Sequence, residues 1–329
     1  MGCVSNGRAA GNAGRGISLQ WLVALAIVLG MLLLGAALAW QGYHGIRQTL
    51  VAAAGDSAQQ IGKTIDERAR RLIDPVHSSI RLLAHNPAAQ TPAQRLERLP
   101  QLVETLDANR MLSAAYMGYP SGEFLLVRRL RDPQLLQRFA APPGTVFLVQ
   151  SVSREGGAVQ GEWRFYDHAL NLLQAQAKPE YRYDPRTRPW FVEASAQPTT
   201  VLTHPYVFFT TREIGLTMAQ RSVDGGAVIG MDVSVDDLAS ETQGLRMTPG
   251  TEIVVVDDQG SVVAYPDLQR VIVHEGQAVR LSRIGELGIP SLQHLYADLP
   301  QGTRPQPYQV DGQTWYGMRV QLTNLAGQD

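Results

Sequence analysis

The nine residues "YDPRTRPWF" at positions 183–191 combine two arginines, two prolines and three aromatic rings. Aromatic residues make up only 7% of the chain, so three rings in nine positions are a local concentration. The two prolines fix their own φ angle and bias the residue before each toward an extended backbone. In an extended segment Arg186, Arg188 and Trp190 point to the same side. A guanidinium beside an indole suits a planar anion, because arginine offers a donor fork and the ring excludes water.

Two segments further along the chain offer partners for such an anion-bearing ligand. Asp232 interrupts the apolar strand "GAVIGMDVS" (226–234), where an unpaired charge is unfavourable. If the ligand is an amino acid, its ammonium needs an anionic group of this kind. Tyr206 in "THPYVFF" (203–209) supplies a hydroxyl and a ring wall. We expect the two phenylalanines that follow it, Phe208 and Phe209, to lie in the core.

An uncharged segment near the N-terminus predicts a membrane span. Residues 21–40 read "WLVALAIVLGMLLLGAALAW", with a tryptophan at each end. Twenty helical residues reach roughly 30 Å, which matches the hydrocarbon thickness of a bilayer. Arg8 and Arg15 precede the span without an acidic neighbour, so the positive-inside rule leaves the N-terminus in the cytoplasm. The chain after about residue 41 is then expected on the outer side of the membrane.

A stripe of apolar or small residues predicts a long amphipathic helix over residues 46–83. Core packing and a homodimer contact through the Ile46–Leu83 helix and the membrane span both explain this stripe. Its members are spaced by three or four residues and are Ile46, Leu50, Ala54, Ala58, Ile61, Ile65, Ala69, Leu72, Val76, Ile80 and Leu83.

The sequence period changes from helix to strand near residue 113. "SAAYMGYPSGEFLLVRR" (113–129) predicts two strands joined by a turn with proline and glycine. Four further strands are expected before a short helix at 236–243. "TEIVVVDDQGSVVAYPD" (251–267) repeats the strand–turn–strand pattern and opens a second, shorter unit. The second unit ends after one more strand, which predicts that the chain is truncated. The pattern as a whole indicates an α+β fold with two antiparallel-sheet units.

Composition and motifs argue against several classes of function. A net charge of -1 does not indicate a nucleic-acid-binding face. The seven histidines show no metal-ligand spacing, and the single cysteine, Cys3, permits no disulfide within one chain. No nucleophile elbow or phosphate-binding loop is recognisable. We therefore expect no catalytic residues, no metal and no cofactor.

The order of these motifs resembles the double Cache sensor domains of bacterial transmembrane receptors. The segments "YDPRTRPWF", "THPYVFF", "GAVIGMDVS" and "VVVDDQGSVVAYPD" follow one another behind a membrane span and a long helix, and the resemblance covers roughly residues 45–329. It implies a periplasmic ligand-binding region with two PAS-like units, of which the membrane-distal unit holds the ligand. The domain boundaries expected on this basis are 1–20 for a cytoplasmic tail, 21–40 for the transmembrane helix, 41–92 for the long helix, 93–245 for the distal unit and 246–329 for the proximal unit.

The resemblance also implies a set of ligand contacts. In the amino-acid-binding members, residues of the same motifs line the pocket, with the arginine holding the ligand carboxylate and the aspartate its ammonium. Phe191 stands where many members carry a second tyrosine, and this departure makes the pocket drier. Arg186 is expected in an ion pair at the surface. The positions that match the family motif are Tyr183, Arg188, Trp190, Tyr206 and Asp232.

These features predict the sensor portion of an inner-membrane receptor that binds an amino acid or related carboxylate. Several kinds of cytoplasmic output domain, including kinases, cyclases and chemotaxis signalling domains, occur behind such sensors, and the sequence does not choose among them. The alternative is a structural or dimerisation module without a soluble ligand. A pocket filled by its own side chains would favour that alternative.

Overall fold

The structure is a computed structural model that describes residues 19–155, 158–244, 246, 249–275, 278–302 and 305–320. It divides into two bodies, residues 1–57 and 58–329. Helix α1 (Leu19–Ala84) contributes to both bodies. Arg8 and Arg15, on which the expected topology rests, lie outside the described residues.

The first body consists, in its described part, of the N-terminal portion of α1. The most apolar stretch within Leu19–Ile46 has a mean hydropathy of 2.8, so this portion is long and apolar enough to cross a membrane. The apolar segment extends beyond the predicted 21–40 span at both ends. No residue of its most apolar stretch is buried against other parts of the chain.

The second body is built around one antiparallel sheet, which has nine strands among the described residues. The strand order is β5-β4-β3-β2-β1-β9-β8-β6, and β7 also pairs with β8. The central strands β1, β2 and β9 are almost entirely buried. The strands are β1 (Ala114–Gly118), β2 (Phe124–Arg129), β3 (Phe147–Glu155), β4 (Ala158–Tyr166), β5 (Leu172–Ala177), β6 (Val201–Leu202), β7 (Tyr206–Val207), β8 (Ile214–Arg221) and β9 (Val228–Ser234).

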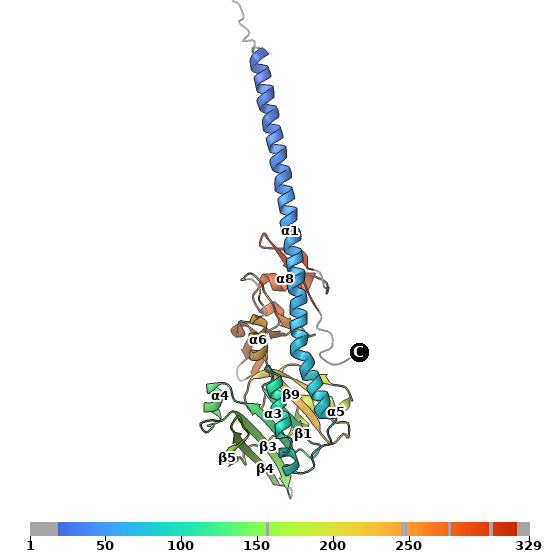
Figure 1. The fold of residues 1–329 in the computed structure, drawn as a ribbon, viewed down its shortest axis with the longest axis vertical. Coiled ribbons are helices and arrows are strands. Elements are labelled where there is room, and N and C mark those ends of the chain that lie inside the picture. Colours follow the sequence, from blue (N-terminus) through green and yellow to red (C-terminus); the bar gives the residue numbers. More distant parts are fainter. Residues whose placement is uncertain are drawn as a thin grey trace, which may run out of the picture. The chain divides into compact units, whose positions relative to one another are not determined.

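Helices cover one face of this sheet. The C-terminal turns of α1 and helix α3 (Leu99–Ala108) pack on alternate residues of the central strands (Figure 1). Val76, Ile80 and Leu83 of α1 are buried in this core, so that end of the apolar stripe serves core packing. Ile46 is exposed. The side chains of Leu50, Ala54, Ala58, Ile65, Ala69 and Leu72 lie outside the described part of the chain.

The opposite face of the sheet carries the segment 183–191. This segment is not extended as expected, because Pro185 opens a 3-10 turn, η1 (Pro185–Thr187), and Pro189 opens helix α5 (Pro189–Ala196). Proline at the first helical position is favoured, since its fixed φ suits a helix and its missing N–H would have no partner there. Asp184 and Arg188, which precede the prolines, are extended.

The C-terminal elements of the second body follow helix α6 (Val235–Gly244). Val235 of α6 and Ile214 of β8 share a hydrophobic cluster with the C-terminal elements, among them Val262 and Val271. The other helices are α2 (Pro92–Leu96), α4 (Pro133–Arg138), α7 (Leu268–Val271), η2 (Ile284–Glu286) and α8 (Pro290–Asp298), and the remaining strands are β10 (Val255–Val256), β11 (Val262–Ala264), β12 (Ile272–Glu275), β13 (Ala278–Leu281), β14 (Gln306–Val310) and β15 (Gln313–Gly317).

Most predicted elements of the second body are present. The strand pair at 113–129 appears as β1 and β2, and the helix expected at 236–243 is α6. Two short helices, α2 and α3, follow α1 and precede the sheet. Strands β5, β8, β12, β13 and β14 were not predicted.

Candidate ligand-binding site

The register of the sheet places a row of polar residues on the face opposite α3. Thr217 on β8 pairs with Asp232 on β9, which pairs with Ala114 on β1, which pairs with Arg128 on β2. Directly paired residues on neighbouring strands point to the same side of a sheet. The row therefore brings a carboxylate and a guanidinium to one buried face, with only an alanine between them.

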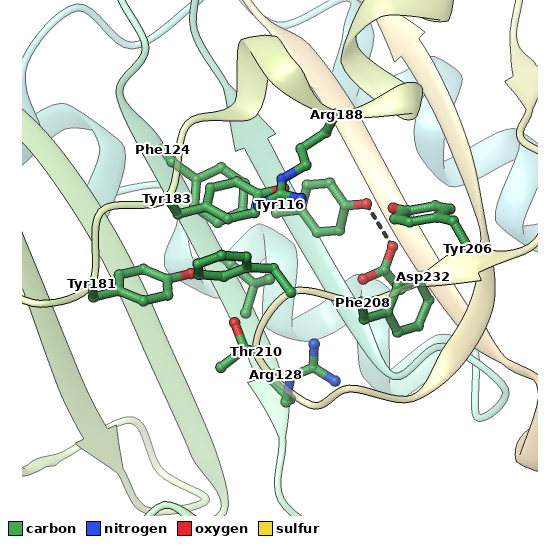
Figure 2. Close-up of a pocket in the computed structure, with 12 residues that line it drawn as sticks. Tyr116, Phe124, Arg128, Tyr181, Tyr183, Arg188, Tyr206, Phe208, Thr210 and Asp232 are labelled. Atoms are coloured by element: carbon green, nitrogen blue, oxygen red, sulfur yellow. Dashed lines mark hydrogen bonds between the residues drawn. The ribbon is translucent and has the colours of Figure 1, made fainter. Parts of the chain in front are cut away.

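Three hydroxyl groups surround the carboxylate of Asp232. Tyr116 donates to its Oδ1 across 2.5 Å, and Thr217 donates to the same atom across 2.6 Å. The hydroxyl of Tyr206 lies 2.6 Å from that of Thr217. Because Thr217 uses its proton on Asp232, it accepts from Tyr206. The carboxylate is thus the acceptor at the end of a short hydrogen-bond chain, and Figure 2 shows its contact with Tyr116.

Gly230 makes room for this arrangement. Gly230 lies on β9, two residues before Asp232, and pairs directly with Tyr116 on β1. A Cβ atom at position 230 would overlap the ring of Tyr116. The missing side chain lets the ring lie over β9 and bring its hydroxyl to Asp232. This packing gives a physical reason for a glycine two residues before the aspartate.

Burial dominates the titration of Asp232. Its side chain is only 4% exposed. Desolvation raises the pKa of Asp232 to about 6, although hydrogen bonds from Thr217 and Tyr116 and the charge of Arg128 act in the opposite direction. A positive ligand group beside the carboxylate would favour its ionised form.

Arg188 enters the same pocket from the other side. It is the residue before helix α5, and its guanidinium lies 5.0 Å from the ring centre of Tyr183 and 4.6 Å from that of Phe209. Figure 2 shows it reaching over Tyr183 toward the space beside Tyr116. Its Nε is buried and has no hydrogen-bond acceptor among the described residues. A cation stacked between rings and lacking an acceptor is suited to bind an anion.

Trp190 lies behind the cavity and does not line it. Its side chain is completely buried, and its Nε1 donates to the hydroxyl of Tyr183 across 3.1 Å. The structure therefore gives Trp190 a position from which it orients Tyr183. Tyr183, Arg188, Tyr206 and Asp232 all line the same cavity.

Arg186 and Phe209 lie at the more exposed edge of this region. The guanidinium of Arg186 forms an ion pair with Asp184 at 2.7 Å, at the partly exposed edge of the turn, as expected. Phe209 was expected in the core, but it is 36% exposed and its ring stacks on Arg188. Phe208 is buried.

The cavity itself is small and mostly aromatic. Its free volume is about 20 Å³, which has room for roughly one water molecule. A second cavity has a volume of about 520 Å³. Its lining residues come from two segments, between His204 and Ile214 and between Asp257 and Glu286. Tyr206 borders both cavities. The lining residues of the small cavity that were not predicted as ligand contacts are Tyr116, Phe124, Leu126, Arg128, Tyr181, Phe208, Phe209 and Thr210.

An exposed acidic group lies beside the larger cavity. His204 is 3.7 Å from Asp258, and potential ligand atoms of these two residues and Asp257 lie within 4.8 Å of one another. His204 and Asp258 are largely exposed, and Asp257 accepts backbone hydrogen bonds in a turn. Turn formation accounts for Asp257 without a metal.

Known structures share this architecture. The sensory domain of the Campylobacter jejuni chemoreceptor Tlp3, in a structure with isoleucine bound, matches with a TM-score of 0.51 at 14% identity, over 84% of this chain and 91% of that one. A second Tlp3 structure matches with a TM-score of 0.52 over 92% of its length. The chain therefore has the fold of bacterial chemoreceptor sensory domains of the double Cache type, which confirms the fold implied by the sequence resemblance.

Relatives in sequence are signalling proteins. Adenylate cyclase 1 of Rhizobium meliloti is 26% identical over 269 residues, which is 79% of this chain and 40% of the cyclase. The methyl-accepting chemotaxis protein McpB of Bacillus subtilis is 36% identical over 92 residues, 27% of this chain and 14% of McpB. The chain thus spans less than half the length of these relatives. No protein family model matches the chain.

Proposed function

We propose that this chain is the sensor portion of a bacterial membrane receptor and that it binds an amino acid or a related carboxylate. The observation that carries the proposal is the placement of Arg188 and Asp232 in one buried pocket. Neither has a salt-bridge partner among the described residues. A ligand with a carboxylate and an ammonium would supply both missing partners.

The roles follow from the chemistry of each side chain. The guanidinium of Arg188 offers parallel donors to the carboxylate, and the rings of Tyr183 and Phe209 hold it in place. Asp232 accepts from the ammonium, and its hydroxyl partners keep it oriented. Tyr206 closes the pocket beside Asp232, and Trp190 positions Tyr183. Amino-acid ligands in the related Tlp3 structures support this class of ligand.

Membrane placement is part of the same proposal. The apolar Leu19–Ile46 segment spans the inner membrane, the preceding residues lie in the cytoplasm, and the second body lies in the periplasm. We propose that two copies associate through the membrane span and the N-terminal part of the 46–83 helix, because Val76, Ile80 and Leu83 are occupied in the core of their own chain.

A cytoplasmic output domain completes the receptor. In the related adenylate cyclase and chemotaxis protein, the region similar to this chain makes up less than half of the sequence. The ligand contacts described above do not depend on which kind of output domain the receptor carries. Ligand binding would act on the output through its different affinities for two receptor states.

The size of the cavity favours a second candidate function. A free volume of about 20 Å³ does not hold an amino acid, so binding requires side chains such as Phe209 to move. If they do not move, the second body is a structural or dimerisation module that takes no soluble ligand. The two functions differ in a single measurable property, which is ligand binding.

A thermal-shift screen of the full chain in lipid nanodiscs separates them. Amino acids, amines, purines and simple carboxylates are each added in excess, and the unfolding midpoint is recorded. A ligand at 100 times its Kd stabilises the folded state by about 2.7 kcal/mol, which is readily detected. A shift with amino acids that disappears in Arg188→Ala supports the sensor function. No shift with any compound favours the structural module.

A further inference from the structure

Three side chains beside the cavity carry buried polar atoms that have no hydrogen-bond partner among the described residues. Gln150 on β3 is completely buried, and both its Oε1 and its Nε2 are without a partner among the described residues. Nε1 of Trp163 on β4 and Nε of Arg128 on β2 also have no hydrogen-bond partner among the described residues. The Arg128 residue is only 2% exposed. An unsatisfied buried donor or acceptor costs about 1–3 kcal/mol, so this grouping needs an explanation.

The sheet register places the three residues together on the face that carries the ligand pocket. Gln150 pairs directly with Leu126 on one side and with Trp163 on the other. Arg128 follows Leu126 by two residues on β2 and therefore points to the same side. Leu126 and Arg128 both line the cavity. The three polar groups thus lie along the side of the pocket that faces away from Asp232.

Tyr181 connects the cavity with this polar group. It lines the cavity, and its ring packs edge-on against Trp163 with the ring centres 6.0 Å apart. Tyr181 therefore lies between the cavity and Trp163, the residue that pairs with Gln150 across β3 and β4. In Figure 2, Tyr181 and Arg128 border the part of the pocket opposite Tyr206 and away from the approach of Arg188.

The hydrogen-bonding pattern specifies the complementary group. Nε1 of Trp163, Nε of Arg128 and Nε2 of Gln150 are donors, and Oε1 of Gln150 is an acceptor. The complement must supply an oxygen that accepts more than one hydrogen bond, together with one N–H donor. A carboxamide has both. The charge of Arg128 already interacts with the carboxyl groups of Glu213, Asp232 and Asp237. The ligand group that contacts Arg128 therefore does not need a negative charge.

We infer that the site is specific for an amino acid whose side chain ends in a carboxamide, with that group held by Gln150, Trp163 and Arg128. This inference rests on the proposed function, in which Arg188 and Asp232 hold the carboxylate and ammonium. A site built to hydrogen-bond a ligand group discriminates strongly against analogues that lack it, because its own polar groups then stay unpaired. L-Glutamine is the matching probe.

Calorimetric titration of the full chain in nanodiscs tests the inference with four amino acids. L-Glutamine should bind at least about tenfold more tightly than L-methionine, which has a similar length and no carboxamide, and than L-glutamate. In Gln150→Leu, glutamine should fall to the affinity of methionine, while L-alanine, which does not reach Gln150, should bind unchanged.

Two controls keep the outcome interpretable. Gln150→Leu replaces an unsatisfied polar side chain with an apolar one, so its unfolding midpoint should stay equal or rise. Gln174→Leu, at an exposed position on β5, should change neither preference nor affinity. Equal binding of alanine, methionine and glutamine, tighter binding of glutamate, or an unchanged glutamine preference in Gln150→Leu overturns the inference and leaves the proposed function standing. If none of the four amino acids binds, the inference is overturned, and the proposed function fails as well when the thermal-shift screen finds no other amino acid or carboxylate that binds.

Discussion

The hydroxyl of Tyr116 and Oδ1 of Asp232 lie 2.5 Å apart on neighbouring strands, and the space for this contact comes from Gly230. Tyr116 faces Gly230 directly, so its ring extends over β9 and reaches Asp232 diagonally. The Gly-x-Asp sequence is therefore a packing unit that exposes one carboxylate to the pocket and satisfies it with hydroxyl donors.

Replacing Gly230 should disrupt the site through packing alone. In Gly230→Ala the new methyl group overlaps the ring of Tyr116, and overpacking of this kind typically destabilises a protein by about 1–3 kcal/mol. We expect a lower thermal unfolding midpoint and weaker binding of any amino-acid ligand. Gly285→Ala is the matched control, since nothing lies within 4 Å of the new atom there. Equal midpoints for the two variants would show that Tyr116 does not depend on Gly230.

Asp232 should make stability depend on pH. Burial raises its pKa to about 6, above the usual 3.8. The folded state therefore binds this proton more tightly than the unfolded state, and the contribution to stability falls as the pH rises from about 4 to 6. The difference between these two pKa values corresponds to about 3 kcal/mol. Asp232→Asn removes this loss, so the variant should gain thermal stability relative to the wild type between pH 4 and pH 7. A stability difference between the two proteins that stays constant across this range would contradict the raised pKa.

Hydrogen bonds from Thr217 should set the pH range of ligand binding. An ammonium binds the ionised Asp232, so affinity should increase as the pH rises toward 6 and level off above it. The Thr217 hydroxyl lowers the pKa of Asp232 against the larger effect of burial. Thr217→Val removes that donor at nearly constant volume and should move the midpoint of the binding curve to higher pH. The measurement is titration calorimetry at several pH values, and a midpoint that moves down or stays fixed would contradict this assignment.

Cysteine crosslinking should locate the contact between two copies. We expect single cysteines placed along residues 46–65, in a chain with Cys3 replaced, to crosslink in native membranes at helical intervals of three or four residues. Cysteines at Val76 or Ile80 should not crosslink, because these positions are buried in the core of their own chain. Uniform crosslinking, or none along 46–65, would argue against association through this helix.

Sequence patterns predicted the fold well where hydrophobic periodicity and turn residues were strong. The β1–β2 hairpin was predicted from two apolar runs around a turn, and the helix expected at 236–243 corresponds to α6. The 183–191 segment was predicted as extended, because the bias that proline imposes on the preceding residue was applied to the whole segment. Proline at the first helical position has the opposite effect, and it starts both η1 and α5.

The site was only partly predictable for a similar reason. Arg188 and Asp232 were recognised as a cation beside rings and an acid in an apolar strand. Arg128 and Gln150 also interrupt buried strands, but the pairing that brings them to the pocket face depends on sheet register, which the sequence does not display. Trp190 was expected to line the pocket, yet its distance from the cavity follows from helix α5 turning its side chain into the core.

Calorimetric titration of an amino acid against the wild-type chain, Arg188→Ala, Arg188→Lys and Asp232→Asn is the sharpest test of the proposed ligand site. Removing one partner of a buried charge pair costs about 2–5 kcal/mol, so Arg188→Ala should weaken binding at least tenfold, at about 1.4 kcal/mol per decade. Arg188→Lys should restore little, because lysine lacks the planar donor fork. Asp232→Asn should lose amino acids and retain simple carboxylates. If all three folded variants bind the ligand as tightly as the wild type, the ligand site is elsewhere and "YDPRTRPWF" serves only the fold.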